Sequence, residues 1–315
     1  MMEVIPCTAI IPTRNRPLIL AKTLQSIADQ EFIPAEIIIN DGSEDESTYY
    51  LCSKFNNPAY FNIQYQKATR NGAAVQRNEA LKLSSFDFIF FMDDDIELEK
   101  NCIKNLWVAI QSGENIGGVN ALITNQKYVK PGKITFFMYH LMHGKKLNSY
   151  AGKCIGPAWN LLPEDNENLP EYVHVDWLNT TCTMYRKDAL PKPLFPKIFI
   201  GYSLMEDLYL SLLVGKHWQL YNCRTSKIFH NSQPGTHKKS SYEISKMELL
   251  NRYYIMKNVL NKNSFSDYLK LYLLEFYFLI NILTNINKVK RILLILAGKI
   301  SASIEIFLNK PLNND

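Results

Sequence analysis

The segment FDFIFFMDDD, residues 86–95, is an apolar run that ends in three consecutive aspartates. The apolar part is short and rich in aromatic residues, which is typical of a buried β-strand. Three adjacent carboxylates repel one another, and apolar surroundings increase that repulsion. A bound cation, the donors of a ligand or plain solvent could each offset it. The segment therefore predicts a buried strand that ends at either a binding site or a solvated turn.

Other strand-like runs precede this segment, and helical patterns lie between them. The runs are CTAII (7–11), EIIIN (36–40) and FNIQY (61–65). Apolar residues recur at helical spacing after Pro17, over residues 75–81, and from Ile103 to near Gly113. Strands that are apolar on both faces and alternate with helices predict an α/β fold. We expect a Rossmann-like, mainly parallel central sheet flanked by helices.

A polar cluster follows each of three predicted strands: PTRNRP (12–17), NDGSEDES (40–47) and MDDD (92–95). In such sheets ligands bind beyond the carboxyl ends of the strands, so the three clusters should converge on one rim. Strand alternation places Asp93 and Asp95 on one side, with Asp94 pointing away. Carboxylate oxygens suit Mn²⁺ or Mg²⁺, and we therefore expect a divalent cation at this rim.

The charge distribution and the cysteines limit the classes of partner and compartment. The net charge is +5, with 23 Lys and Arg against 24 Asp and Glu in residues 1–230, but 12 against 6 in residues 231–315. A basic C-terminal region favours an anionic surface or phosphates over nucleic acid. The six cysteines form no CxxC pair, and the N-terminus has no signal-peptide pattern. We therefore expect reduced thiols in a cytoplasmic protein.

The last part of the chain contains two apolar segments. YLKLYLLEFYFLINIL (268–283) is interrupted by Lys270 and Glu275, and KVKRILLILAGKI (288–300) is basic and amphipathic. The first is marginal for a membrane span, which needs about 20 apolar residues. The second resembles helices that lie on anionic membranes. Either segment could instead pack on the preceding domain or on a second subunit, so a peripheral position at the inner membrane face and a homo-oligomer both remain open.

Four segments, in this order and spacing, resemble the nucleotide-sugar-binding half of family 2 glycosyltransferases, which have the GT-A fold. They are PTRNRP, NDGSEDES, NGAAVQRNEAL (71–81) and FIFFMDDDIELEKN (88–101). The resemblance implies a GT-A catalytic domain at 1–230, with a nucleotide-sugar-binding half (1–120) and an acceptor-binding half (121–230). A mobile loop and a C-terminal helical region would follow at 231–315.

The resemblance also implies roles in the first half. Asp41 would accept a hydrogen bond from the base of a uridine nucleotide, unless it only forms an Asx turn. Arg77 would stand near the base or diphosphate, unless it lies on a solvated helix face. Asp95 would bind the metal that bridges the diphosphate. The other residues expected to bind the nucleotide are Pro12, Thr13, Arg14, Asp93, which would contact the ribose, and Asp94.

In the second half, a β-rich segment (175–188) precedes Glu206 and Asp207 at the start of a predicted helix (205–218). The resemblance makes Asp207 the general base that removes the proton of the acceptor hydroxyl. Glu206 and Trp177 would bind the acceptor. The alternative is that both carboxylates only stabilise the helix N-terminus. Residues 179–181 read Asn-Thr-Thr where the family often has glycine, which leaves the shape of the sugar pocket open.

His230 follows the apolar run KIF, and a histidine here completes the metal site in some GT-A enzymes. A lone histidine is more often structural. The loop 231–242 has the composition of a mobile lid, in which His237, Lys238 and Lys239 could close over a diphosphate.

Together these features predict a metal-dependent, inverting glycosyltransferase. The donor would be a nucleotide-diphosphate sugar, with UDP favoured, and the acceptor a hydroxyl of a glycan or of a lipid-linked saccharide. The alternatives are a nucleotidyltransferase, and a non-catalytic protein of the same fold that binds nucleotide sugars or glycans.

Overall fold

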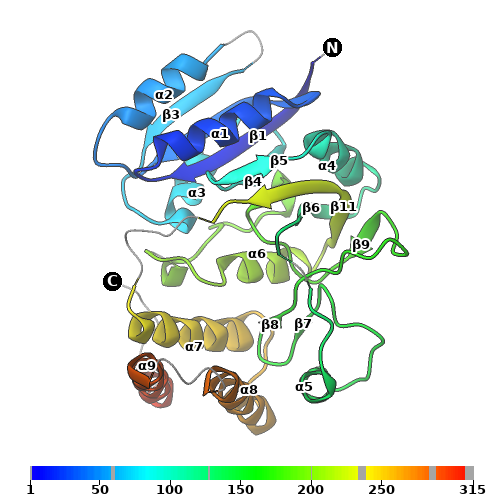
Figure 1. The fold of residues 1–315 in the computed structure, drawn as a ribbon, viewed down its shortest axis with the longest axis vertical. Helices are drawn as coiled ribbons and strands as arrows, with labels where there is room; N and C mark the ends of the chain where they lie inside the picture. Colours follow the sequence, from blue (N-terminus) through cyan, green and yellow to red (C-terminus); the bar gives the residue numbers. More distant parts are fainter. Residues whose placement is uncertain are drawn as a thin grey trace.

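The computed structural model describes residues 2–57, 61–126, 128–199, 201–232, 239–283 and 289–308. Within these residues, nine strands form one central sheet (Figure 1). They are β1 (Glu3–Thr13), β2 (Phe32–Asp41), β3 (Ile63–Lys67), β4 (Phe88–Met92), β5 (Ile96–Leu98), β6 (Ile116–Ile123), β9 (Tyr172–His174), β10 (Cys182–Arg186) and β11 (Gln219–His230). Their spatial order is β3-β2-β1-β4-β10-β6-β11-β5, and β9 also pairs with β11.

The sheet is mainly parallel, as the sequence predicts. Strands β1, β2, β3 and β4 are mutually parallel, and β6 is parallel to β11. Strand β10 lies between β4 and β6 and is antiparallel to both, so both predicted halves of the catalytic domain contribute to one sheet. The predicted β-rich segment 175–188 forms only this strand. Its first part is a loop, in which Trp177 and Leu178 are buried among side chains of the core.

Helices cover both faces of the sheet. They are α1 (Pro17–Ala28), α2 (Ser47–Phe55), α3 (Ala73–Leu81), α4 (Cys102–Gln111) and α6 (Glu206–Val214). Apolar side chains of α1, α2 and α4 pack in one core cluster with Ile11 and Ile39, whereas those of α3 and α6 pack in a second cluster with Ile10 and Ile38. Since successive residues of a strand point to opposite faces, these clusters lie on opposite sides of the sheet. The helices expected after Pro17, at 75–81 and at 103–113 are confirmed.

Between β6 and β9 the chain leaves the central sheet. This part contains α5 (Lys133–His143) and a two-stranded ladder of β7 (Cys154–Ile155) and β8 (Trp159–Asn160). Helix α5 and the ladder share a small apolar core with Tyr150 and Leu274.

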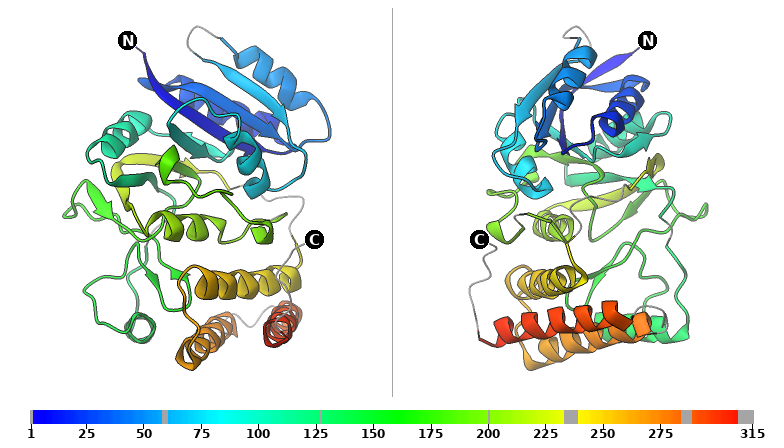
Figure 2. Two further views of the ribbon diagram at one scale, coloured as in Figure 1. Left: turned by 180° about the vertical axis from the view of Figure 1, so that it is seen from behind. Right: turned by 60° about the vertical axis from the view of Figure 1, so that its left-hand side comes forward.

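In the described part of the C-terminal region the chain forms three helices: α7 (Ser241–Asn258), α8 (Phe265–Leu283) and α9 (Val289–Phe307). Helix α7 lies between the sheet domain and the outer pair α8 and α9 (Figure 2). Sequence inspection missed α7 because buried residues occur on several of its faces, so it shows no single apolar stripe. Its start is well marked, however, since Ser240 and Glu243 form a capping box. The two outer helices match the predicted apolar segments.

The two charges that interrupt the apolar segment 268–283 have defined partners. Glu275 is buried and pairs with Lys299 of α9 and, at 3.1 Å, with Nε of Arg252 of α7. Glu248 completes this group, which we name the helix cluster, at 3.2 Å from Arg252 and 3.7 Å from Lys299. The Nζ of Lys270 lies 3.4 Å from the carbonyl oxygen of Met142. The outer helices thus pack on the rest of the protein through their charged as well as their apolar residues.

Three further sequence expectations concern the membrane span, the lid and the cysteines. Among the described helices, none combines the length and the apolar character that a membrane span requires. His237 and Lys238 of the expected lid lie outside the described residues, as does Lys288, whereas Lys239 is described. The six cysteines are free thiols, as expected, and all except Cys154 are buried.

Candidate functional site

A cavity of about 700 Å³ lies at the carboxyl ends of β1 and β4, within the size range of small-molecule sites. Its lining joins the predicted polar clusters after these two strands to the start of α3 and the start of α6. The predicted site residues that line it are Pro12, Thr13, Arg14, Arg77, Asp93, Asp94, Asp95, Glu206, Asp207 and His230. The predicted convergence of polar clusters on one rim is found for PTRNRP and MDDD, whereas no residue of NDGSEDES (40–47) lines the cavity.

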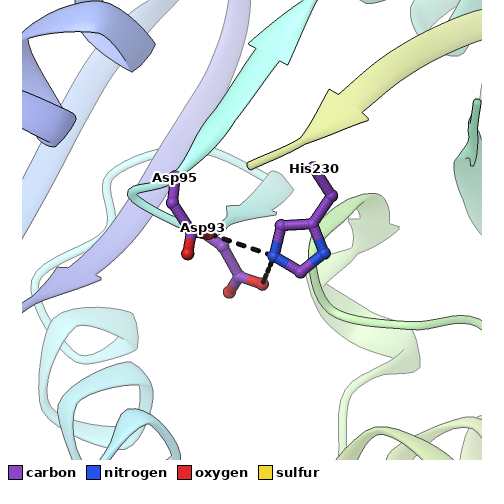
Figure 3. Close-up of side chains that lie close together, drawn as sticks. All are labelled: Asp93, Asp95 and His230. Atoms are coloured by element: carbon purple, nitrogen blue, oxygen red, sulfur yellow. Dashed lines mark hydrogen bonds and ion pairs between the residues drawn. The ribbon is translucent and has the colours of Figure 1, made fainter. Parts of the chain in front are cut away.

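Asp93, Asp95 and His230 lie on one side of the cavity (Figure 3). The Nε2 atom of His230 is 3.1 Å from Oδ1 of Asp95 and 4.0 Å from Oδ2 of Asp93. One ligand atom from each residue lies within 4.8 Å of the others, close enough for all three to coordinate one ion. The hydrogen bond to Asp95 raises the pKa of His230, against the opposing effect of burial. Two carboxylates and an imidazole suit a divalent cation such as Mn²⁺.

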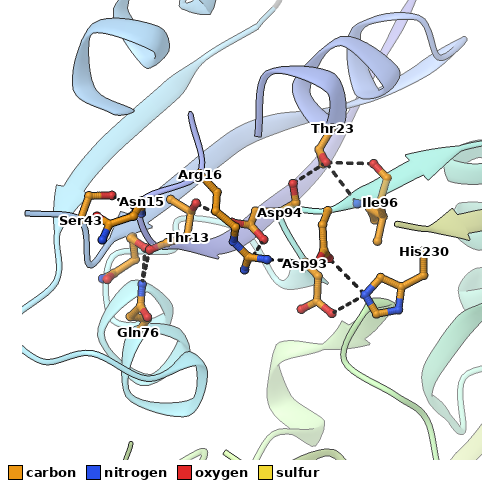
Figure 4. A network of polar contacts seen from close by, with 12 residues as sticks. Thr13, Asn15, Arg16, Thr23, Ser43, Gln76, Asp93, Asp94, Ile96 and His230 are labelled. Carbon is orange, nitrogen blue, oxygen red and sulfur yellow. Dashed lines mark hydrogen bonds and ion pairs between the residues drawn. The ribbon is translucent and has the colours of Figure 1, made fainter. Parts of the chain in front are cut away.

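Asp94 points away from this group, as alternation predicts. Its carboxylate accepts a hydrogen bond from Oγ1 of Thr13 at 2.6 Å and pairs with Arg16 at 2.8 Å. Burial raises the pKa of Asp94 to about 7, although Arg16 and Thr13 act in the opposite direction. The Thr23 hydroxyl of α1 contacts the carbonyl oxygens of Asp94 and Ile96 (Figure 4). We name residues 93–95 the aspartate turn. Through Thr13 and Arg16, Asp94 holds this turn against the end of β1 and the loop that follows it.

Arg77 is buried and lies between the start of α6 and the group formed by Asp93, Asp95 and His230. It pairs with Oδ1 of Asp93 at 2.6 Å and with Oε1 of Glu206 at 3.6 Å. The alternative of a solvated helix face is therefore wrong for this residue. A fixed guanidinium between two carboxylates offsets part of their repulsion.

Glu206 and Asp207 are the first two residues of α6, and both face the cavity. Met205 before them has a left-handed backbone (φ 67°), which turns the chain sharply into the helix. Oδ1 of Asp207 accepts a hydrogen bond from the backbone N–H of Leu208 at 2.7 Å. Burial of the carboxylate, with a further contribution from Glu206, raises the pKa of Asp207 to about 7. Its position is thus typical of a helix N-terminus and also suitable for a base.

Asp41 and Trp177 do not line the cavity. Asp41 is fully buried and accepts hydrogen bonds from the backbone N–H and the hydroxyl of Ser43, which is an Asx turn. Its second oxygen accepts a hydrogen bond from the hydroxyl of Tyr65 at 3.0 Å. Trp177 packs in the core beneath α6 and donates from Nε1 to the carbonyl oxygen of Leu161 at 2.8 Å.

Several residues of the site had no assigned role in the sequence. Arg16 links Asp94 to Asp95, with Nη1 3.2 Å from Oδ2 of Asp95. Gln76 donates to the carbonyl oxygens of Thr13 and Asn40, and so joins the ends of β1 and β2. Arg16 lies in PTRNRP and Gln76 in NGAAVQRNEAL, so their positions in these two motifs could have identified them as site residues. Further lining residues are Asn15, Asn71, Gly72, Ala73, Thr180, Thr181, Gly201, Tyr202, Ser203 and Lys239.

Gly72 allows the loop at Gly201 to approach the cavity closely. Its φ of 134° is one that side chains rarely permit, and an added Cβ would lie 2.5 Å from the carbonyl oxygen of Gly201. The absence of a side chain at Gly72 therefore allows this close approach, although the two residues are distant in sequence.

Solved structures with a similar fold carry nucleotide sugars or their products. GalNAc-T7, solved with UDP, GalNAc and Mn²⁺, has a TM-score of 0.55 and 14% identity, covering 80% of this chain and 47% of its own. The mannosyltransferase PcManGT from Pyrobaculum calidifontis, solved with GDP-Man and Mn²⁺, has a TM-score of 0.54 and 11% identity, covering 97% and 88%. At these identities the comparison shows the fold, and it agrees with the predicted GT-A architecture.

Curated relatives match the first part of the chain. The GalNAc(5)-diNAcBac-PP-undecaprenol beta-1,3-glucosyltransferase of Campylobacter jejuni is 31% identical over 110 residues, 34% of this chain and 35% of the relative. The poly(ribitol-phosphate) beta-N-acetylglucosaminyltransferase TarS of Staphylococcus aureus is 28% identical over 101 residues, 31% of this chain and 18% of the relative. The similarity thus spans about a third or less of the length of these relatives.

The family comparison covers more of the chain. The model of glycosyl transferase family 2 matches residues 8–192, more than half of the 315 residues, and this range runs from within β1 to beyond β10 and includes the aspartate turn. The chain therefore belongs to glycosyl transferase family 2.

Proposed function

We propose that the protein transfers a sugar from a nucleotide-diphosphate sugar to a hydroxyl group of a glycan or lipid-linked saccharide, with inversion at the anomeric carbon. The observation that carries this proposal is the arrangement of the cavity in a family 2 chain. A group suited to a metal ion, Asp93, Asp95 and His230, faces the same space as a carboxylate pair, Glu206 and Asp207. A non-catalytic binding protein would not need the second pair.

The residues fit a divalent cation, because two carboxylates and one imidazole converge within 4.8 Å. Asp93, Asp95 and His230 would hold Mn²⁺, or Mg²⁺ in its place. When bound, the ion would stabilise the charge that develops on the leaving diphosphate. Arg16 and Lys239 also line the cavity, and we assign them to the phosphates.

Asp207 supplies the base in this proposal. As the acceptor oxygen forms its bond to the anomeric carbon, the bond from that carbon to the diphosphate oxygen breaks, and the acceptor proton passes to a carboxylate oxygen of Asp207. A pKa raised to about 7 suits this role, because such a carboxylate is basic yet substantially ionised near neutral pH. Arg77 would hold Asp93 and Glu206 in place on either side of the reacting atoms.

The identities of the nucleotide and of the sugar are more specific proposals. UDP is favoured by the resemblance of the first half. Asp41 has no part in this proposal, because it is fully buried, both its oxygens are engaged by Ser43 and Tyr65, and it does not line the cavity. The names of the two curated relatives include glucosyl and N-acetylglucosaminyl transfer, and one name includes an undecaprenol-linked acceptor. We therefore take UDP-glucose and UDP-N-acetylglucosamine as the first donors to test, with a lipid-linked saccharide as acceptor.

A donor-hydrolysis screen tests the proposal without knowledge of the acceptor. The full chain is incubated with UDP-glucose, UDP-N-acetylglucosamine, UDP-N-acetylgalactosamine and GDP-mannose in the presence of Mn²⁺, and release of free nucleotide is measured. We expect slow release from one of these donors, and loss of that release when EDTA is added. Tight binding of a donor with neither hydrolysis nor transfer to any saccharide would instead indicate a non-catalytic binding protein.

A further inference from the structure

Helices α5, α8 and α9 lie along one edge of the molecule, the edge farthest from β1 and β3 (Figures 1 and 2). They come from two separate parts of the chain, and contacts join them into one layer. The hydroxyls of Thr135 of α5 and Tyr277 of α8 are 2.8 Å apart. On its other side α8 pairs with α9 through Glu275 and Lys299.

The outward direction of α8 follows from these contacts. Phe276 stands between Glu275, which faces α9, and Tyr277, which faces α5, and successive helix residues differ by about 100°. Phe276 must therefore point away from both neighbours, and its side chain is 60% exposed. Leu269, Tyr272 and Ile280 are exposed on the same stripe, at spacings of three and four residues.

The other two helices also carry stripes of exposed apolar residues. On α9, Ile300 follows the inward-facing Lys299 and is exposed, as are Leu293, Ile304 and Phe307. On α5 the exposed apolar residues are Ile134, Phe137 and Leu141. We name the exposed apolar stripes of α5, α8 and α9 the outer helix face. A soluble monomer rarely exposes so many large apolar side chains in one continuous layer.

The exposed charge on these helices is positive. Among the described side chains of α5, α8 and α9, the exposed charged ones are Lys133 and Arg291. The acidic residues of these helices are engaged elsewhere: Glu275 lies in the helix cluster, Glu305 pairs with Lys246 at 2.6 Å, and Asp267 caps the start of α8 through Ser264. Three more exposed lysines flank α5: Lys130, Lys145 and Lys146.

We propose that the outer helix face docks on an anionic membrane surface, with the apolar stripes in the interfacial region and the basic residues on lipid phosphates. Apolar side chains rimmed by Lys and Arg match such a surface in both respects. A second copy of the chain would bring one basic rim against another, which is unfavourable. The inference goes beyond the transferase reaction and does not depend on it.

Co-sedimentation of the full-length protein with vesicles tests this inference. We expect binding to phosphatidylcholine vesicles that contain phosphatidylglycerol, and much weaker binding to phosphatidylcholine alone. Phe276→Glu and Ile304→Glu should each lower the affinity for the mixed vesicles by at least about tenfold, because a charge replaces an apolar contact with the interface. Lys133→Gln and Arg291→Gln should each lower it by about fivefold. The control is Val108→Glu, which alters an exposed apolar residue of α4 and should bind normally.

Circular dichroism and thermal melting verify that each variant is folded, and Leu293→Glu replaces any variant that is not. Failure of the wild-type protein to bind the mixed vesicles would overturn the inference. A wild-type dimer that Phe276→Glu converts to a monomer, with no vesicle binding by either, would overturn it in favour of a subunit interface. Neither result depends on sugar transfer, so the donor-hydrolysis screen remains an independent test of the proposed function.

Discussion

Two groups of charged side chains in this protein differ in how their charges are balanced. The helix cluster contains two cations, Arg252 and Lys299, and two anions, Glu248 and Glu275, each paired with a member of opposite sign. The cavity rim contains five carboxylates, and the described cations that pair with them are Arg16, Arg77 and the ionisable His230. Arg14 and Lys239 also line the cavity, and Arg14 pairs with Glu44 instead. The carboxylates of the rim are Asp93, Asp94, Asp95, Glu206 and Asp207.

The two groups differ in whether a bound ligand could balance their charges, which distinguishes a structural group of charged residues from a functional one. A balanced buried group leaves nothing for a ligand to supply, and its natural role is to join α7, α8 and α9. In the rim the carboxylates outnumber the cations paired with them, so a bound cation can offset part of their repulsion. The predictions below test this distinction, from the largest expected effect to the smallest.

Asp95→Asn should abolish Mn²⁺-dependent binding of the nucleotide diphosphate, because it removes an anionic ligand with little change in shape. Calorimetric titration with UDP and Mn²⁺ measures this effect. Asp188→Asn, a change at an exposed aspartate of similar chemistry, is the control and should bind normally. Equal affinity of wild type and Asp95→Asn would remove this residue from the metal site.

Asp207→Asn should reduce sugar transfer by roughly 10²–10⁴, the usual contribution of a positioned base. Donor binding should be retained, and the loss should appear in kcat, because the proton is removed only in the transition state. Steady-state kinetics with a competent acceptor measure both quantities. If a folded variant transfers at the wild-type rate, Glu206 becomes the next candidate for the base.

Glu275→Gln should lower the free energy of unfolding by about 3–5 kcal/mol, because it leaves buried Lys299 and Arg252 short of one counter-charge. Chemical denaturation measures this change. Lys104→Gln, which breaks the exposed pair with Glu31, is the control and should cost less than about 1 kcal/mol. Donor binding by folded Glu275→Gln should match the wild type, and a selective loss of donor binding would contradict a purely structural role.

The transfer rate should rise with pH through about 7, since the raised pKa leaves Asp207 protonated at lower pH and only the ionised form accepts a proton. Below this pKa we expect about a tenfold change per pH unit. Rates at saturating donor and Mn²⁺ between pH 5.5 and 8.5, chosen as about 1.5 units either side of the pKa, provide the measurement. Residual activity of Asp207→Asn should lack this dependence, and an unchanged profile would assign the titration to another group.

Much of the rim could be predicted because its motifs follow strands whose apolar runs are easily recognised. Strand alternation alone separated Asp94 from Asp93 and Asp95. Contacts between distant segments could not be predicted in this way. The pairing of Arg77 with Glu206 depends on how α3 and α6 pack on the same face of the sheet, and no local pattern encodes that arrangement.

The C-terminal region shows a second limit of sequence reasoning. An apolar segment interrupted by Glu275 suggests either a membrane surface or packing on protein, because sequence alone does not show which residues meet. The structure separates the two faces of α8. Its inner face holds Glu275 and Leu274 against the protein, and its outer face exposes Phe276. Removal of the whole region would therefore test folding rather than surface binding.

Strand β10 has a consequence for how far the segment before it can change. Residues 124–171 run outside the central sheet after β6, β9 then pairs with β11, and the chain enters β10, where the backbone N–H of Asp93 donates to the carbonyl oxygen of Thr181 at 2.9 Å. Both ends of this segment are thus held by backbone ladders. A change of length between β6 and β9 would therefore leave the strands beside the aspartate turn in register.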